Sequence, residues 1–145
     1  YEKTEALIHE KDMVSSAQEV SINENLIINY DKYNENTIII GDFNSNVIWD
    51  KSHGKRSHST VVSELKKKNI VSAYHYITGE VEGQETQSTF YLYKNKNKPY
   101  HIDYCFSNPK NIADFQILSS EHWLKYSDHT PIQIITNYSD TKQEV

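Results

Sequence analysis

Hydrophobic positions along the chain recur with a helical period in its first half and with a strand period in its second half. Over residues 14–33 the apolar side chains fall on one helical stripe, which predicts an amphipathic helix. Residues 37–40 form a short, β-branched apolar run, which is typical of a strand buried on both faces. After a polar loop over 44–58, a second helix is expected from Ser59, with lysines in its last turn that complement the helix dipole.

Beyond the second helix the hydrophobic period becomes two, which indicates strands. The expected strands are residues 70–76, 89–93, 100–107, 115–119 and 131–136. The lysine- and asparagine-rich segment 94–99 predicts a hairpin connection, and residues 79–87 a polar loop. The chain has no repeats and no internal linker, so we expect one domain over residues 1–145. Its fold class is α/β (α+β), with sheet packed against helix.

Composition narrows the class of protein further. A chain of 145 residues with 37% hydrophobic and 12% aromatic residues can bury a core and is not expected to be disordered. No stretch approaches the ~18 consecutive apolar residues of a membrane span. The single cysteine, Cys105, excludes an internal disulfide and a cysteine-based zinc site. We therefore expect a globular, soluble, cytoplasmic protein.

The net charge of −5 arises in the first part of the chain. Residues 1–36 contain three lysines and eight acidic residues, whereas the remaining residues contain twelve of each sign. The acidity therefore says little about the part of the chain that carries candidate chemistry.

The first candidate for chemistry is Asp42 with Asn44, directly after the apolar run and Gly41. In open α/β sheets, polar residues at the carboxyl end of a buried strand face the ligand crevice. The acid can orient or deprotonate a nucleophile, and the amide can donate hydrogen bonds to developing negative charge. The same residues are ordinary turn chemistry, and the segment alone does not decide between a site and a turn.

Two further acid and histidine positions lie near the end of the chain. Asp128 and His129 offer a metal ligand beside a group that titrates near neutral pH, or else a capped turn with a surface histidine. Asp103 lies within an aromatic strand, where a carboxylate is costly unless it is paired. His129 is its natural partner, and Lys98 or a backbone amide is the alternative.

Taken together, these segments resemble the endonuclease/exonuclease/phosphatase superfamily, the fold of deoxyribonuclease I. The family motifs occur here in the family's order as Gly41-Asp42-Phe43-Asn44, Ser88-Thr89-Phe90, Ile102-Asp103-Tyr104 and Ser127-Asp128-His129-Thr130-Pro131. The resemblance covers residues 14–136, and residues 137–145 are expected to be a flexible tail.

The resemblance implies a four-layer α/β/β/α sandwich of which this chain supplies about the C-terminal half. The family's first half contributes an asparagine near the first strand, a metal-binding glutamate and a catalytic tyrosine and histidine region, which have no counterpart here. We therefore expect a fragment with little activity by itself. The sheet face that would pack on the missing half is expected to be exposed and prone to association.

The resemblance also implies a metal-dependent phosphoesterase with assigned roles. Asp42 would orient or deprotonate the attacking water, and Asn44 would bind a phosphoryl oxygen. Asp128 would help to hold Mg²⁺ or Mn²⁺, since carboxylate and amide oxygens suit hard cations. His129 would contact the phosphate or transfer a proton, while Asp103 holds its imidazole.

Substrate contacts are expected from Trp49, which can stack on a base, and from Thr89, Phe90 and Tyr104 beside the matched motifs. A phosphodiester or phosphomonoester is expected as substrate, with nucleic acid somewhat favoured. The chain has 14 lysines and one arginine, so bidentate base contacts are nearly absent and sequence-specific DNA recognition is not predicted. The remaining histidines are expected to be ordinary surface or hydrogen-bonded residues: His9, His53, His58, His75 and His122.

Two alternatives stay open. The domain is a non-catalytic binding or interaction module if the complete protein binds no Mg²⁺ or Mn²⁺. It is a metal-independent hydrolase that uses Asp42 and His129 alone if its activity survives EDTA.

Overall fold

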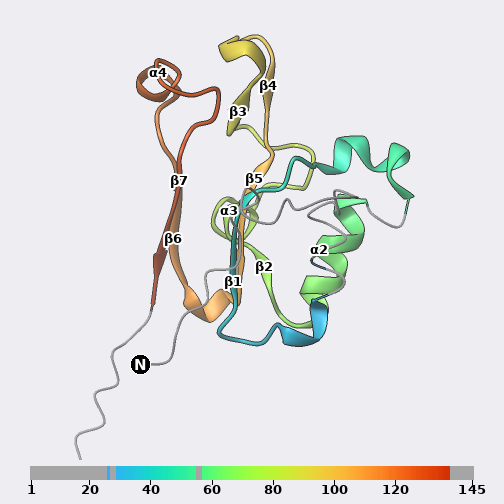
Figure 1. Cartoon of the computed structure of the whole chain (residues 1–145). Coiled ribbons are helices and arrows are strands. Elements are labelled where there is room, and N and C mark those ends of the chain that lie inside the picture. Colours follow the sequence, from blue (N-terminus) through green and yellow to red (C-terminus); the bar gives the residue numbers. More distant parts are fainter. Residues whose placement is uncertain (1–25, 27–28, 55–56, 138–145) are drawn as a thin grey trace, which may run out of the picture.

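The computed structural model describes residue 26, residues 29–54 and residues 57–137, which form an α+β architecture of short helices and small antiparallel sheets (Figure 1). The predicted mixture of helix and sheet is confirmed at this level. In the described part of the chain, no helix has the length and apolar character needed to cross a membrane.

The central sheet has the strand order β1-β5-β2, with β5 (Asp103–Ser107) between β1 (Ile38–Asp42) and β2 (Val71–Ser72). β1 runs antiparallel to β5, from the pair Ile38 and Ser107 to the pair Asp42 and Asp103. The prediction of a strand buried on both faces is wrong for most of β1, because only Ile39 is fully buried. Among the described strands β1 lies at an edge, so its neighbours cover it less completely.

Two hairpins complete the described sheets. β3 (Phe90–Tyr91) pairs with β4 (Pro99–Tyr100), and the turn between them includes the 3-10 helix η5 (Leu92–Lys94). The hairpin predicted at residues 94–99 is thereby confirmed. β6 (Ile112–Ile117) pairs with β7 (Ile132–Thr136), and the short helix α4 (Ser120–Trp123) lies in their connection.

Helix α2 (His58–Lys67) is confirmed and begins one residue before the predicted start. Its N-cap is Ser57, whose side chain accepts a hydrogen bond from Thr60 N at 3.3 Å. Helix α3 (Ala73–Thr78), by contrast, occupies most of a predicted strand, so the prediction of strand over 70–76 is wrong beyond Ser72. The helical conformation buries both Ala73 and Tyr74 in the core. Gly79, at φ 72°, ends the helix with a left-handed cap.

Other boundaries differ from the predicted ones. The expected strand over 100–107 is interrupted at residues 101 and 102, and that over 89–93 turns into η5 after Tyr91. Within the described ranges, three further 3-10 helices occur: η2 (Tyr30–Lys32), η3 (Val47–Ser52) and η6 (Pro109–Asn111). Most of the helix predicted at 14–33 lies outside the described residues. The first residue of the expected tail, Asn137, donates its backbone N–H to Asn111 O at 3.0 Å, and residues 138–145 lie outside the description.

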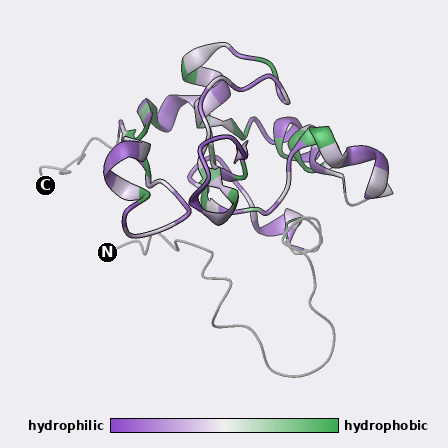
Figure 2. Cartoon of the chain, turned by 90° about the horizontal axis from the view of Figure 1, so that it is seen from above, coloured by the Kyte–Doolittle hydropathy of each residue, from purple (hydrophilic) through white to green (hydrophobic). Residues whose placement is uncertain are grey.

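The two faces of the central sheet carry separate cores. Alternation along β5 turns Tyr104 and Phe106 toward α2 and Cys105 toward α3 and the β6–β7 hairpin. Figure 1 shows this order of layers, with the β6–β7 hairpin and α2 on opposite sides of the sheet. Hydrophilic residues follow much of the ribbon, and the hydrophobic segments are short (Figure 2).

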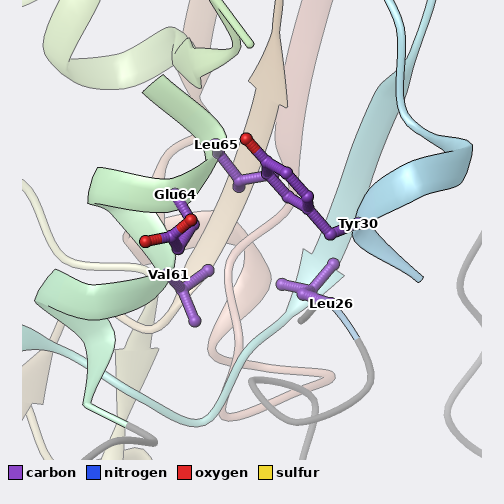
Figure 3. Close-up of a pocket in the computed structure, with 5 residues that line it drawn as sticks. All are labelled: Leu26, Tyr30, Val61, Glu64 and Leu65. Atoms are coloured by element: carbon purple, nitrogen blue, oxygen red, sulfur yellow. The ribbon is translucent and has the colours of Figure 1, made fainter. Parts of the chain in front are cut away.

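A small apolar cavity of about 120 Å³ lies beside α2, where Val61 and Leu65 face Leu26 and Tyr30 (Figure 3). Its one charged lining residue, Glu64, pairs with Lys67. Because the lining brings no converging polar groups together, this cavity is not the candidate site.

Candidate active site

Antiparallel pairing of β1 with β5 places two acids side by side. Asp42, the last residue of β1, is the register partner of Asp103, the first residue of β5. The pairing continues one step further, since Phe43 N donates to Ile102 O at 2.9 Å. Directly opposed residues project from the same face of a sheet, so two carboxylates face one space at this end of the strands.

His129 lies between these two acids. Its Nδ1 is 3.0 Å and 3.1 Å from the two carboxylate oxygens of Asp103, and its Nε2 is 3.9 Å from Asp42 Oδ2. The predicted pairing of Asp103 with His129, rather than with Lys98, is present. The side chains of Asp42 and His129 are 37% and 32% exposed, whereas that of Asp103 is 13% exposed. Solvent and ligands therefore reach the first two more easily.

The loop that carries His129 is tied to β3 through its backbone. Tyr91 N donates to Asp128 O, and Thr130 N donates to Thr89 O, both at 2.8 Å. These bonds flank His129 on either side, so its ring is held against β3 in spite of lying outside regular structure. The ring of Phe90 adds a side-chain contact, with its centroid 4.8 Å from that of His129.

Thr89 connects the two halves of the site. Its hydroxyl oxygen accepts hydrogen bonds from Ile102 N and Asp103 N, both at 3.0 Å, and its side chain is fully buried. Those bonds also explain why the strand predicted at 100–107 is interrupted before Asp103. The prediction that Thr89 contacts substrate is wrong, because the hydroxyl is enclosed and positions Asp103 instead.

Tyr104 is also a core residue and not a substrate contact. It is fully buried, its hydroxyl donates to His101 O at 3.0 Å, and Asn46 Nδ2 donates to that hydroxyl at 3.0 Å. Trp49 lies in η3, with its ring centroid 5.5 Å from that of Tyr100. Phe90 and Trp49 therefore remain as candidate substrate contacts.

Asp42 and Asn44 form a turn and lie at the candidate site at the same time. It is exposed, has a left-handed φ of 48°, and donates its backbone N–H to Asp42 Oδ1 at 2.7 Å. Asparagine tolerates this backbone conformation better than most residues. The turn thus fixes the carboxylate of Asp42 and leaves the Asn44 residue at the surface beside it.

Burial and neighbouring charge shift two pKa values in the site. Burial raises the pKa of Asp42, against the lowering effect of the Asn44 amide, and the nearby Asp103 raises it further. The hydrogen bond with Asp103 raises the pKa of His129, outweighing the effect of burial. A more basic carboxylate next to a more readily protonated imidazole is a suitable pair for moving protons.

Ligand atoms of Asp42, Asp103 and His129 lie within 4.8 Å of one another, a spacing that can hold a metal ion. Asp128, the residue predicted to hold the metal, is not in this group. Its charge still acts on the site, because it raises the pKa of both Asp42 and His129. The backbone carbonyl of Asp128 is paired with β3, since it accepts the N–H of Tyr91.

The turn around His129, which the sequence offered as an alternative to a site, is present and positions the site. Ser127 Oγ accepts a hydrogen bond from His129 N at 3.0 Å, and Thr130 joins the same loop to Thr89. Serine two residues before histidine is a common side-chain-to-backbone turn, which was the one available signal.

Comparison of the chain with protein-family models and with curated proteins finds no match.

Proposed function

We propose that this chain carries the Asp–His part of the active site of a metal-dependent phosphoesterase with a deoxyribonuclease I-like fold. The single observation behind it is the arrangement of Asp42, His129 and Asp103 on adjoining strands and one loop. The order of the matched motifs and an antiparallel central sheet with α2 packed on one face and α3 on the other support this proposal. The substrate class is a phosphodiester or phosphomonoester, with nucleic acid favoured.

Asp103 and Asp42 have different roles in this proposal. Asp103 accepts the Nδ1–H of His129, which leaves Nε2 directed toward Asp42. The 3.9 Å between Nε2 and Asp42 Oδ2 is too long for a direct hydrogen bond, so both atoms remain available to a group between them.

In the proposed reaction Asp42 takes a proton from water while the water oxygen forms a bond to phosphorus. The bond from phosphorus to the ester oxygen breaks, and the leaving alcohol receives a proton. His129, protonated at Nε2, contacts the phosphoryl oxygen or supplies that proton. Asn44 donates to another phosphoryl oxygen as negative charge develops.

The donor set fits a hard divalent cation, because ligand atoms of Asp42, Asp103 and His129 lie within 4.8 Å of one another and two of the three residues are carboxylates. Asp42 would hold Mg²⁺ or Mn²⁺, and Asp128, whose charge acts on Asp42 and His129, would help to hold it. Such an ion would polarise the phosphoryl oxygen and offset charge in the transition state. We also propose that the chain associates with a partner through an exposed apolar sheet face. The candidate strand is β7, where Ile135 is 46% exposed.

The test is hydrolysis of bis(p-nitrophenyl) phosphate with Mg²⁺ by the full-length gene product. Asp42→Asn and His129→Ala should each lower the rate by at least about 100-fold, the usual contribution of a general acid or base. Asp114→Asn, an acid-to-amide change on β6, is the matched control and should retain the rate. Undiminished turnover in both site variants would refute the assignment, and an absence of Mg²⁺ and Mn²⁺ binding in the full-length protein would favour a binding module.

A further inference from the structure

A second cluster of histidines and carboxylates lies on the α2 side of the central sheet, away from the candidate active site. Its members are His58 at the start of α2, His75 in α3, and Glu82 and Glu85 in the loop that follows α3. His58 Nε2 is 3.6 Å from Glu82 Oε2, and His75 Nε2 is 3.1 Å from Glu85 Oε1. His58 and His75 were expected to be ordinary polar residues, and the structure instead joins them in one cluster.

Both histidines are oriented in the same way. Nδ1 of His58 is 2.6 Å from Ser45 Oγ, and Nδ1 of His75 is 2.7 Å from Ser72 Oγ. The serine contacts fix the two rings, and each Nε2 faces a carboxylate. Nδ1 of His75 also lies 3.4 Å from Glu82 Oε1, so the His75 ring faces both glutamates of the cluster. Metal-binding histidines are usually held in this manner, with a hydrogen bond at the nitrogen that does not bind the metal.

The cluster contains buried polar atoms that the described residues do not satisfy. The side chain of His58 is 0% exposed, and its Nε2 has no hydrogen-bond partner among the described residues. Glu82 Oε2, which faces it, is likewise buried without a hydrogen bond in this part of the chain. Unsatisfied buried groups of this kind are costly, and two of them facing one another indicate that something binds between them.

Glu85 is held firmly as a carboxylate. Its side chain is 5% exposed and accepts hydrogen bonds from Gly83 N at 2.9 Å and from Asn46 Nδ2 at 3.3 Å. These contacts hold the carboxylate in place beside His75 Nε2.

We propose that this cluster is a structural zinc site, with His75, Glu82 and Glu85 as ligands and His58 Nε2 in the fourth position. Ligand atoms of the first three lie within 4.8 Å of one another. Bonds of about 2.0–2.2 Å in a tetrahedron put ligand atoms about 3.3 Å apart, close to the separations from histidine to glutamate given above. Mixed imidazole and carboxylate donors suit Zn²⁺, whereas Mg²⁺ prefers oxygen donors alone.

An ion can reach the cluster from solvent. A pocket of about 260 Å³ is lined by His75 and Glu82 together with residues of α2 and β2. Once bound, zinc would join the loop after α3 to the start of α2, two segments that are otherwise far apart in the sequence. The site would be closed by four protein ligands, as in structural zinc sites.

The test uses the 145-residue chain, stripped with a chelator and then titrated with Zn²⁺. We expect one zinc per chain, a higher thermal midpoint on binding, and tetrahedral visible absorption bands when Co²⁺ replaces zinc. Glu82→Gln, a change at a partly exposed side chain, and His75→Asn should each weaken binding by at least about 100-fold, while Ser72→Ala should weaken it by about 10-fold.

Asp42→Asn is the matched control, because it removes a carboxylate from the candidate active site and should leave zinc affinity unchanged. The zinc site would be refuted by no stoichiometric binding in the wild-type chain, or by affinity that Glu82→Gln and His75→Asn leave intact. Loss of binding in Asp42→Asn alone would also refute it. The wild-type Co²⁺ spectrum decides the matter even if a variant does not fold.

Discussion

The two histidine–carboxylate clusters use similar side chains under different conditions. Both clusters contact strand β5. Asp103 of β5 belongs to the first cluster, and the next residue, Tyr104, stacks with His75 of the second at 6.5 Å between ring centroids. The first cluster is partly exposed and its imidazole already has a carboxylate partner. The second is largely enclosed and has polar atoms that no described residue satisfies.

Access to solvent, more than residue type, distinguishes the candidate reactive site from the candidate structural site. A site for turnover must admit and release substrate, and Asp42 and His129 are each about one-third exposed. A structural metal site is closed by four protein ligands, and in the second cluster His58 is fully enclosed.

The largest expected effect comes from exchanging acid for amide in each cluster separately. Asp103→Asn should lower Mg²⁺-dependent phosphodiester hydrolysis by at least about 100-fold, because His129 loses the group that orients and charges it. Glu85→Gln should leave that rate in place and remove zinc binding. The hydrolysis rate and the zinc content should be measured on both variants. Loss of both properties in either variant would show that the two clusters are not independent.

Thr89→Val should lower the free energy of unfolding by about 2–6 kcal/mol, since one buried and one partly buried amide each lose an acceptor worth about 1–3 kcal/mol. Both Ile102 N and Asp103 N depend on that hydroxyl. Urea unfolding measures the change, and Thr89→Ser is the control that keeps the acceptor. Equal destabilisation by the serine variant would show that packing of the methyl group, and not the hydrogen bonds, matters.

The titration of His129 should be displaced upward from its ordinary pKa of about 6.5. The pair with Asp103 raises this pKa, so the pair's stabilisation is fully present below the ordinary pKa. It is lost as pH rises through the raised value. NMR titration of the imidazole should show the upward shift, and Asp103→Asn should lower the pKa. An unchanged pKa in that variant would show that Asp103 does not control the ring.

The smallest expected effect is that of Ser127→Ala, which removes one acceptor from the backbone N–H of His129. We expect a loss of about 0.5–1.5 kcal/mol in unfolding free energy, the net contribution of a typical hydrogen bond. Chemical denaturation measures it. No change in stability together with a slower reaction would show that this bond serves positioning alone.

Local sequence patterns predicted the elements that local interactions stabilise. α2 follows from its apolar spacing and basic last turn, and the β3–β4 hairpin follows from the polar turn between two aromatic runs. The segment at Ala73 and Tyr74 was predicted wrongly, because its β-like composition was overridden by packing on β5 and β6. The pairing of Asp103 with His129 was predictable because a carboxylate in an apolar strand requires a partner.

Local sequence is enough to indicate the helix and the hairpin, the ordered acid and histidine motifs, and the need for a partner at Asp103. Only the tertiary structure decided that Asp42 lies opposite Asp103, since strand register depends on contacts between distant segments. It also enclosed Thr89 and brought His58 and His75 to Glu82 and Glu85. Burial and distance are properties of the folded chain. They distinguish the positioning hydroxyl of Thr89 from a substrate contact, and they distinguish the proposed zinc site from four unrelated polar residues.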